Sequence, residues 1–429
     1  MERILIRQVN QKAGENILLK GYVHKIRKLG RIAFLILRDR SGLIQCVIDT
    51  KSIDIKGIKH ESVVEIIGRV NLIANTINEA EVQVQELKVL VLVKEDVPIE
   101  LNKELLDVNI DTLLNNRVLS LRNIKNNYIF KVEAILAQSF AEFLKNEDFT
   151  QVFTPKIVAE GTEGGTELFE VKYFEKKAYL AQSPQFYKQM LVGAGFERVF
   201  EIGHVYRAEE HNTLRHLNEY VSLDLEVGFI NDEKDIMKLE TRLLKFMLSE
   251  VESKLSEELK VLEIQLPDIK DEIPAMKLET AIEILKTKYN KVDLEKDLDP
   301  EGERLIGEYI KETTGSDFIF LTHYPRSKRP MYVMPEGEAS THSFDLLFRG
   351  IEITTGGQRI HDYEMLKESI SSRGMDINSF QDYLTVFKFG MIPHGGMAIG
   401  LERLTAQLLG KKNVRETTLF PRDRDRIAP

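Results

Sequence analysis

The chain of 429 residues has no tryptophan and one cysteine, Cys46. A single cysteine excludes an internal disulfide and fits the reducing environment of the cytoplasm. The nine histidines are scattered, and without paired cysteines they do not match a structural zinc site. No segment approaches the ~20 consecutive apolar residues that a membrane helix requires. The first residues also lack the apolar stretch of a secretory signal. We therefore expect a soluble, cytoplasmic protein without a membrane partner.

The net charge of −9 argues by itself against a nucleic-acid partner. The charge is unevenly distributed, however. Residues 1–50 carry ten Lys or Arg and four Asp or Glu, a local net charge of +6. A local basic face is typical of a module that binds a polyanion, and it is also found on ordinary solvated surfaces. Charge alone leaves both interpretations open.

The first quarter of the chain has the pattern of a small β-domain. Residues 17–95 contain five short segments rich in Val and Ile, separated by Gly, Asn and Asp. Five strands within about eighty residues predict a closed barrel of the OB type, a common binder of single-stranded nucleic acid. We assign residues 1–97 to this domain. Residues 98–122 begin with a proline and lack a strand pattern, so we predict a linker or hinge.

From Asn123 the pattern changes, and residues 123–429 are predicted to form a second, larger domain. Apolar residues recur at helical spacing from Ile129 to Phe143, which predicts an amphipathic helix. The strand-like segment FTQVFTPKIV follows. Residues 232–340 are rich in Glu and Lys at helical spacing, and we interpret them as a helical insertion.

Opposite charges are crowded in residues 206–226, YRAEEHNTLRHLNEYVSLDLE. This segment contains two arginines, two histidines and five carboxylates, and it ends in an alternating, strand-like run. The charges either neutralise each other on a wet surface or form a site for a ligand that carries both signs.

A helix start is indicated in YLAQSPQFYKQMLVGAGF, where Ser183 precedes Pro184. Gln185 and Lys188 then lie three residues apart, on one face of the helix. An amide and an ammonium group beside a helix N-terminus could hold a small carboxylate. An exposed polar face explains the same pattern.

A hairpin is predicted in THSFDLLFRGIEITTGGQRIHD, with its turn at Arg349-Gly350. A two-residue turn places Asp345 and Glu352 on one face as diagonal neighbours. Two such carboxylates repel unless a cation lies between them, so a magnesium site is plausible. Strict alternation places Thr355 on the other face unless the strand bends.

The segment PHGGMAIGLERLTAQLLGKK predicts a glycine-rich strand that leads into a helix. Arg403 lies in the first turn of this helix, off its apolar face. A cation there opposes the helix dipole, so the position needs another explanation. A bound polyphosphate provides one.

Taken together, these segments resemble the signature regions of class II aminoacyl-tRNA synthetases. The helix and strand ending at Pro155 are similar to the first region, residues 198–229 to the second, and GMAIGLERL to the third. With an OB-type barrel in front, the chain resembles the aspartate, asparagine and lysine group. The strings TEGGTELF, QSPQFYKQ, GGQR and FPRDRDRIAP are similar to aspartyl-tRNA synthetases of the archaeal and eukaryotic type. The resemblance implies an α+β catalytic domain built on an antiparallel sheet.

The resemblance implies that the second domain binds ATP. Arg207 is expected to hold the α-phosphate, and Arg403 to reach the γ-phosphate; these two are the candidate catalytic residues. Glu209 is expected to bind the adenine amino group, and Tyr220 to stack on the adenine. The other candidates at the nucleotide are Arg215, His216, Leu217, Glu352 and Gly400.

Mg²⁺ is the implied cofactor, with Asp345, Glu352 and Thr355 as its expected ligands. Relatives usually have serine at the position of Thr355. The threonine keeps the hydroxyl and adds a methyl group.

For the amino acid, the resemblance implies L-aspartate, with its side-chain carboxylate held by Lys188 and Arg359. Asparagine would leave both of these buried charges unpaired. The ammonium and α-carboxylate region is expected to contact the remaining candidates, which are Glu163, Ser183, Gln185, Asp224 and Thr355.

In the barrel, Phe34 and Gln45 match positions that stack on and read anticodon bases, with Arg27 nearby. His24 stands where archaeal enzymes restricted to tRNA(Asp) tend to have tryptophan. The loop ANTINEAEVQVQEL also has no Lys or Arg, where restricted relatives often carry a lysine. Both features favour an enzyme that charges tRNA(Asp) and also tRNA(Asn).

Three other functions stay open: a discriminating aspartyl enzyme, an asparaginyl enzyme, and a tRNA-binding paralogue without catalysis. The charged positions named above are all present, which argues against the paralogue. The segment around Pro155 resembles a dimer-interface element, so we expect a homodimer.

Overall fold

A computed structural model describes residues 1–74, 79–162, 167–210, 213–294 and 296–429. The chain forms two compact units, Met1–Asn127 and Tyr128–Pro429. Within the described ranges, no helix has both the length and the apolar character needed to cross a membrane.

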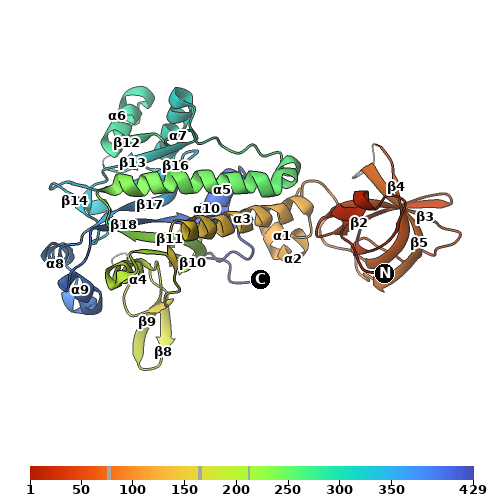
Figure 1. Cartoon of the computed structure of the whole chain (residues 1–429), viewed down its shortest axis with the longest axis horizontal. Helices are drawn as coiled ribbons and strands as arrows, with labels where there is room; N and C mark the ends of the chain where they lie inside the picture. The colour runs from red at the N-terminus through yellow and green to blue at the C-terminus, as the bar shows by residue number, and fades with distance from the viewer. Residues whose placement is uncertain (75–78, 163–166, 211–212, 295) are drawn as a thin grey trace. The chain divides into compact units, whose positions relative to one another are not determined.

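The first unit contains a closed barrel, which confirms the predicted OB-type fold (Figure 1). Its strands follow the order β1-β2-β3-β5-β4, and only the pair β3 and β5 is parallel among those described. Inward-facing residues such as Leu35, Ile44 and Ile66 are fully buried and fill the barrel. The elements are η1 (Ile6–Lys12), β1 (Asn16–Leu29), β2 (Ile32–Asp39), β3 (Gly42–Asp49), β4 (Val63–Leu72) and β5 (Ala80–Val91).

The segment after the barrel contains two short helices, α1 (Ile110–Asn115) and α2 (Arg117–Ser120). Arg122 connects this segment to the barrel, because its Nη1 lies 3.1 Å from the buried carboxylate of Glu61. The same carboxylate pairs with Arg38 at 2.7 Å. The predicted domain limits at 97 and 122 stay a prediction.

The second unit is built on a mixed sheet. In Figure 1, helices α5 and α3 run along this sheet, and smaller helices lie around it. In the described part of the chain this sheet has eight strands, in the order β12-β13-β16-β17-β18-β11-β10-β6. The central pairings are antiparallel, as predicted, and the two edge pairings are parallel. The strands are β6 (Thr150–Gln151), β10 (Arg198–Tyr206), β11 (Glu219–Gly228), β12 (Ala275–Lys277), β13 (Phe318–Thr322), β16 (Ser343–Phe348), β17 (Ile351–Arg359) and β18 (His394–Gly400).

Smaller strands and several helices complete this unit. The strands are β7 (Ile157–Val158), β8 (Glu170–Tyr173), β9 (Lys176–Leu180), β14 (Pro335–Glu336) and β15 (Ser340–Thr341). The helices are α3 (Ile124–Asn146), α4 (Gln185–Leu191), η3 (Val192–Phe196), α5 (Glu233–Leu262), α6 (Leu278–Tyr289), α7 (Pro300–Thr314), η4 (Arg326–Lys328), α8 (Tyr363–Ser371), η5 (Ile377–Phe380), α9 (Gln381–Lys388), α10 (Leu401–Leu408) and η6 (Val414–Thr417).

The structure differs from the predicted helical insertion at 232–340. Helices α5, α6 and α7 lie in this range, but so do β12 and β13, which belong to the main sheet. β13 is FIFLT, a fully buried apolar run of five residues. A short run of this kind cannot be assigned to strand or helix by periodicity alone.

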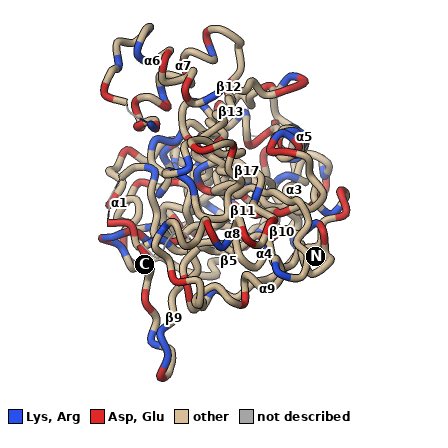
Figure 2. The backbone as a smooth tube through the Cα atoms, turned by 90° about the vertical axis from the view of Figure 1, so that its left-hand side faces the viewer, with Lys and Arg blue, Asp and Glu red and all other residues tan. Residues whose placement is uncertain are grey.

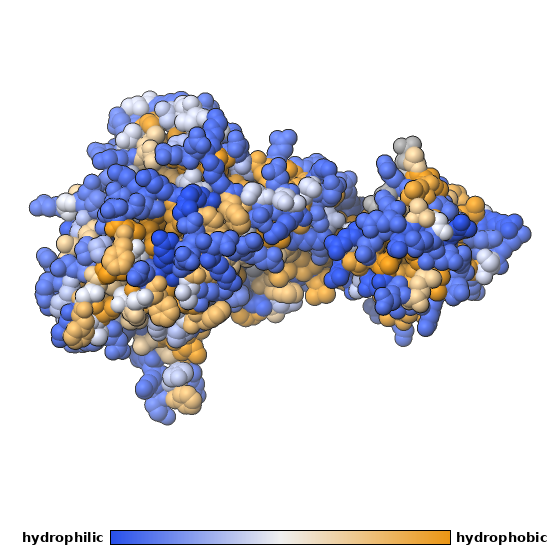
Figure 3. Space-filling view, viewed as in Figure 1, coloured by the Kyte–Doolittle hydropathy of each residue, from blue (hydrophilic) through white to orange (hydrophobic). Residues whose placement is uncertain are grey.

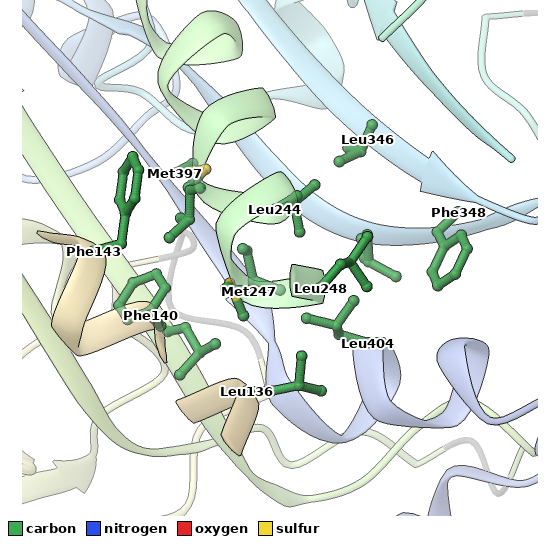
Figure 4. Packing of buried hydrophobic residues seen from close by; sticks show 14 of the residues in the cluster. Leu136, Phe140, Phe143, Leu244, Met247, Leu248, Leu346, Phe348, Met397 and Leu404 are labelled. Carbon is green, nitrogen blue, oxygen red and sulfur yellow. The ribbon is translucent and has the colours of Figure 1, made fainter. Parts of the chain in front are cut away.

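The core of the second unit lies between the sheet and helices α3, α5 and α10 (Figure 4). Phe140 of α3 and Met247 of α5 are fully buried there, beside Met397 of β18. Leu404 of α10 packs into the same cluster. Because these helices cover one face of the sheet, the polar side chains of the opposite face are free to form a site.

Charged residues of both signs are mixed on the surface of this unit. Figure 2 shows this along the β8–β9 hairpin, which carries Glu170, Lys172, Glu175, Lys176 and Lys177. In Figure 3 the visible face is largely hydrophilic, with small apolar areas between the polar ones. The strong local excess of one sign is therefore a feature of residues 1–50 rather than of this hairpin.

The turn of the β16–β17 hairpin packs directly against α7. Both turn residues have positive φ, 48° at Arg349 and 75° at Gly350. A Cβ on Gly350 would lie 2.6 Å from the Cα of Arg304 in α7. Glycine is therefore required at position 350 because the turn packs closely against α7 and because its φ is positive.

Gly350→Ala is expected to destabilise the second unit by about 2–4 kcal/mol, through left-handed strain and overpacking against α7. Gly315 is the matched control, because its φ is 76° but a Cβ added there would meet no atom within 4 Å. Gly315→Ala should cost only about 1 kcal/mol, from strain alone. Urea unfolding of the two variants measures the difference, and equal losses would contradict the packing argument.

Candidate active site

A cavity of about 220 Å³ opens between the β10–β11 hairpin, β17 and the start of α10. The structure places every predicted ATP-contacting residue on its wall. These residues are Arg207, Glu209, Arg215, His216, Leu217, Tyr220, Glu352, Gly400 and Arg403, and Thr355 lines it as well.

The cations of this cavity are held in place by acceptors of the protein. Arg403 donates from Nη1 to the backbone oxygen of Glu352 at 2.9 Å, and the same nitrogen lies 3.7 Å from the Glu352 carboxylate. Arg215 pairs with Glu303 of α7 at 2.7 Å. The arginines are therefore positioned before an anionic ligand arrives, which reduces the ordering that binding requires.

An aromatic ring forms part of the cavity wall. The guanidinium of Arg207 lies 5.9 Å from the ring centroid of Tyr220. Burial raises the pKa of the Tyr220 hydroxyl, so the ring stays neutral. A neutral ring beside arginines is suited to stacking on a nucleobase.

A second, more deeply buried cluster contains Lys188 of α4 and Arg359 of β17. Lys188 Nζ lies 3.0 Å from the carboxylate of Asp224 and 3.3 Å from that of Glu226. Arg359 donates from Nε to Glu226 at 3.0 Å. The two predicted cations, 171 positions apart in the numbering, thus share one carboxylate.

Glu226 was not predicted as a site residue, although the sequence contains a signal for it. Tyr220, Ser222, Asp224 and Glu226 alternate along β11 and therefore point to one face of the sheet. The side chain of Glu226 is completely buried. A Cβ at Gly396 of β18 would lie 2.2 Å from its Oε2, so the neighbouring strand needs glycine there.

Glu226 is ionised in this environment. Burial by itself raises the pKa of Glu226, but Arg359 and Lys188 outweigh it and hold that pKa below its ordinary value. Two cations therefore face two carboxylates, and the buried cluster is electrically balanced.

A hydrogen-bonded chain supports this cluster from behind. Tyr383 donates from its hydroxyl to Oε1 of Gln189 at 3.0 Å, and Gln189 Nε2 lies 2.8 Å from Nε2 of His394. His394 Nδ1 is 2.9 Å from the oxygen of Ile392. Burial lowers the pKa of His394 to about 4, so the imidazole is neutral, with its proton on Nδ1.

The two clusters are neighbours. Ser222 lines the cavity and donates to Asp224 at 2.5 Å, and Asp224 in turn pairs with Lys188. Ala398, another wall residue, lies opposite both Asp224 and Thr355 in the sheet register. A ligand with an anionic tail and a small zwitterionic head could therefore occupy both.

Two further predicted residues lie at the start of α4. The helix begins at Gln185, with Pro184 as its N-cap, one residue later than predicted. Ser183 accepts a hydrogen bond from the Gln185 backbone nitrogen at 3.2 Å. Among the described residues, the buried Nε2 of Gln185 has no partner. The predicted residue Glu163 lies outside the described residues.

The predicted magnesium ligands share one face of the β16–β17 hairpin because of a β-bulge. Leu347 faces Glu352, whereas Leu346 faces Thr354, which leaves Ile353 as the extra residue. The bulge brings Thr355 opposite Asp345, and Thr355 donates to Glu352 at 3.1 Å. Strict alternation would place Thr355 on the other face, and the bulge, rather than a bend at the glycines, brings it to the face of Asp345 and Glu352.

The residues at this hairpin fit a hard divalent cation. Carboxylate and hydroxyl oxygens are its preferred ligands. Oδ1 of Asp345 is buried and lies 2.8 Å from Nη2 of Arg329, so a bound cation would share this carboxylate with the arginine. Burial is the largest influence and raises the pKa of Asp345, while Arg329 opposes it.

In the barrel, three of the four predicted anticodon residues lie on one outer face. Arg27 is directly opposite Phe34 in the β1–β2 register, and Gln45 faces Ile36. His24 is not with them. It is the extra residue of a bulge in β1 and lines a separate cavity of about 630 Å³.

The environment of His24 explains its charge state. Its Nδ1 lies 3.1 Å from Nη1 of Arg38. Burial, followed by the charge of Arg38, lowers the pKa of His24 to about 4, so the ring is neutral near pH 7.

Comparison with known families decides the broad assignment. A family model described as "tRNA synthetases class II (D, K and N)" matches residues 109–424. The chain belongs to this family of class II tRNA synthetases. A second model, "OB-fold nucleic acid binding domain", matches residues 17–90 of this synthetase.

The synthetase is similar along its whole length to named relatives. It is 50% identical over 427 residues to an aspartate–tRNA(Asp/Asn) ligase of Thermus thermophilus, covering 100% of both chains. A ligase of the same name from Deinococcus radiodurans is 48% identical over 437 residues, covering 100% of this chain and 99% of its own. A solved asparaginyl-tRNA synthetase from Pyrococcus horikoshii, complexed with asparaginyl-adenylate, has a TM-score of 0.93 at 31% identity and 100% coverage of both.

Sequence analysis missed three charged residues of the synthetase site besides the bulge. Glu226 was hidden in an alternating strand, whereas Glu303 and Arg329 lie in the region predicted as an insertion. The spacing of residues in the sequence provides no signal for Glu303 and Arg329, because only tertiary packing brings them to Arg215 and Asp345.

One buried carboxyl group of α5 lies behind the site. Glu240 is fully buried, and burial raises its pKa to about 8, with Asp345 adding to the effect. It is therefore protonated at neutral pH in the folded synthetase and ionised in the unfolded chain. Folding stability should then be lost as the pH rises from about 4.5 toward about 8.

Glu240→Gln replaces the neutral acid by an isosteric amide and should remove this pH dependence. The wild type is expected to lose on the order of 3 kcal/mol of unfolding free energy across that window, and the variant much less. Urea unfolding at pH 5 and pH 8 measures the difference. Glu257→Gln, an exposed change on the same helix, is the control and should behave as wild type. An unchanged pH slope in the Glu240 variant would rule out the buried neutral acid.

Proposed function

We propose that the protein is an aspartate–tRNA ligase that activates L-aspartate with ATP and transfers it to tRNA(Asp) and tRNA(Asn). The observation that carries this proposal is the shared contact of Lys188 and Arg359 with Glu226, beside the arginine-lined cavity. The names of the Thermus and Deinococcus relatives agree with it.

Charge balance favours aspartate over asparagine. The unliganded cluster has two cations, Lys188 and Arg359, and two carboxylates, Asp224 and Glu226. Aspartate adds an ammonium group, which Asp224 can accept, and a side-chain carboxylate for the two cations. Both amino acids also carry an α-carboxylate. Asparagine has a neutral amide in place of the side-chain carboxylate, so it offers the buried charges of Lys188 and Arg359 no anionic partner, which is unfavourable.

The likeness to an asparaginyl enzyme at 31% identity does not alter this argument, because a shared fold does not specify the amino acid. The difference between the two substrates is one charged group, and that group is recognised by individual side chains. The aspartate interpretation therefore rests on the buried cluster.

In the first step, the α-carboxylate of aspartate attacks the α-phosphorus of ATP. A phosphorus–oxygen bond to the amino acid forms, the bond to the β-phosphate oxygen breaks, and pyrophosphate leaves with the electron pair. Arg207 is placed to stabilise charge at the α-phosphate, and Arg215 and Arg403 hold the outer phosphates. Positioning and electrostatic stabilisation provide the catalysis.

In the second step, the terminal 3′-hydroxyl of the tRNA attacks the carbonyl carbon of the adenylate. An ester forms and AMP leaves. Mg²⁺, held by Asp345, Glu352 and Thr355, would supply neutralising charge to the phosphate oxygens when bound. Arg27, Phe34 and Gln45 would contact the anticodon on the outer face of the barrel.

A homodimer and a cytoplasmic location complete the proposal. Phe153 is 82% exposed and Ile157 is 48% exposed, on either side of Pro155. Exposed apolar side chains at this element are consistent with a covered interface between two copies. The buried thiol of Cys46, whose pKa is raised by burial, suits a reducing compartment.

Aspartate-dependent exchange between ATP and pyrophosphate tests the activation step. The wild type should exchange with aspartate and at least about 10³-fold less efficiently with asparagine, because asparagine offers the buried cations no anionic partner. Lys188→Gln should lower kcat/KM for aspartate by about 10²-fold or more. The matched control is Lys176→Gln at the exposed first residue of β9, which should leave exchange unchanged. Faster exchange with asparagine would overturn the assignment.

Charging of purified transcripts tests the tRNA range. The wild type should aminoacylate both tRNA(Asp) and tRNA(Asn), whereas His24→Trp should lose mainly tRNA(Asn), since the bulky ring refills the cavity beside Arg38. Exchange with aspartate serves as the control and should be unaffected in this variant. Absence of tRNA(Asn) charging by the wild type would identify a discriminating enzyme.

A further inference from the structure

The side chain of Asn218 contacts the backbone of residues 207–209, which carry two of the predicted ATP contacts. Asn218 directly precedes β11, where the regular pairing of the β10–β11 hairpin ends. Its Nδ2 donates to the backbone oxygen of Arg207 at 2.7 Å and to that of Glu209 at 3.1 Å. Its own backbone oxygen accepts from the Arg207 nitrogen at 2.9 Å. The side-chain amide therefore continues the hydrogen-bond ladder at the point where the two strands separate.

Asn218 is buried, and the C-terminal segment holds it on its other side. Its backbone nitrogen donates to the oxygen of Arg422 at 2.9 Å. Arg422 is followed by a turn that Asp423 stabilises, because Oδ1 of Asp423 accepts from two backbone nitrogens further along the chain, both at 2.9 Å. Asp423 also pairs with the buried Arg415 of η6. Asn218 thus has a fixed position between the C-terminal segment and residues 207–209.

Asn218 reaches the nucleotide cavity through its neighbours. In the described part of the chain it does not line that cavity, whereas Arg207 and Glu209 do. Ala208, between these two residues, donates from its nitrogen to the oxygen of Glu167 at 2.8 Å. The bonds of Asn218 hold the backbone on either side of Ala208. They therefore set the points from which the side chains of Arg207 and Glu209 start.

We propose that Asn218 is a positioning residue, which fixes the backbone of Arg207 and Glu209 so that their side chains meet the α-phosphate and the adenine amino group of ATP. This inference rests on the proposed use of ATP. A guanidinium and a carboxylate that are placed in advance bind the nucleotide without the cost of being ordered by it.

The amide group of Asn218 is what the position requires. Its Nδ2 faces two carbonyl oxygens, and the two hydrogens of an amide nitrogen can satisfy both. Asn218→Asp keeps the size of the side chain but replaces this donor by an oxygen, which repels the two carbonyl oxygens. The backbone of residues 207–209 then loses its support.

Asn123, in the first unit, provides a matched control. It is also buried, and its Nδ2 donates to the backbone oxygens of Leu101 at 3.3 Å and Lys103 at 2.8 Å. Asn123→Asp therefore removes the same kind of donor from two carbonyl oxygens and should lower the stability of its own unit in the same way. A difference in nucleotide binding between the two variants cannot come from the loss of such bonds in general.

Isothermal titration calorimetry of the folded variants measures nucleotide affinity without measuring activity. Asn218→Asp should bind ATP at least about tenfold more weakly than the wild type, because two hydrogen bonds behind the site are lost. Asn123→Asp should bind ATP within about twofold of the wild type. The affinity for L-aspartate should stay unchanged in both variants, because Lys188 and Arg359 are held by Glu226.

A second ligand separates positioning from a general weakening of the site. Purine riboside 5′-triphosphate lacks the 6-amino group that Glu209 is expected to bind. The wild type should prefer ATP to this analogue by about tenfold or more. Asn218→Asp should reduce the preference to about threefold or less, because Glu209 is no longer held in place. Asn123→Asp should keep the preference of the wild type.

An ATP affinity and a preference for ATP that are the same in Asn218→Asp as in Asn123→Asp would overturn the inference. If Asn218→Asp fails to fold, Asn218→Ala and Asn123→Ala replace the pair. Alanine removes the donor without adding a repelling oxygen, and the same difference between the two positions is expected. Failure of the proposed function would instead appear as a wild type that binds ATP but shows no exchange with aspartate, so the two failures are distinguishable.

Discussion

The carboxylate of Glu226 lies between Lys188 and Arg359, and much of the second unit follows from that contact. It joins α4, β11 and β17 at one buried point, and β18 needs glycine at position 396 to leave room for it. Removing one member of such a cluster would leave an uncompensated charge in a dry interior, which is strongly unfavourable. The chain Tyr383–Gln189–His394 then fixes the helix that carries Lys188. The charges of this cluster are thus paired with one another in the protein without a ligand.

The same design extends to the nucleotide cavity. Arg215 is held by Glu303 and Arg403 by Glu352, so each cation has a direction in the unliganded protein. A ligand therefore exchanges partners with existing groups and does not need to order mobile side chains. The anions of residues 206–226 have partners of their own. Asp224 and Glu226 pair with Lys188 and Arg359, and Glu209 lies 3.6 Å from His216.

The β16–β17 hairpin shows how a small backbone irregularity sets the chemistry. The extra residue Ile353 changes the face of the sheet to which the side chains after Glu352 point, and so brings Thr355 to the face of Asp345 and Glu352. Its turn is anchored by the contact between Gly350 and α7. The helices of the region first interpreted as an insertion thus support the site from outside, and Glu303 of α7 reaches into it.

The sequence by itself determined the two folds and most of the site. Strand periodicity predicted the barrel, and the signature segments predicted the cavity residues that the structure brings together, because short motifs with fixed spacing keep their geometry wherever the fold places them. Only the tertiary structure decided the rest. Glu226 and Glu303 have partners far away in the chain, and Arg329 meets Asp345 only through folding of the segment between them. β13 is an apolar run without a distinguishing period, and the bulges at His24 and Ile353 depend on strand pairing. Periodicity describes how a segment faces its surroundings, whereas a contact between distant segments exists only once both have been folded against the same core.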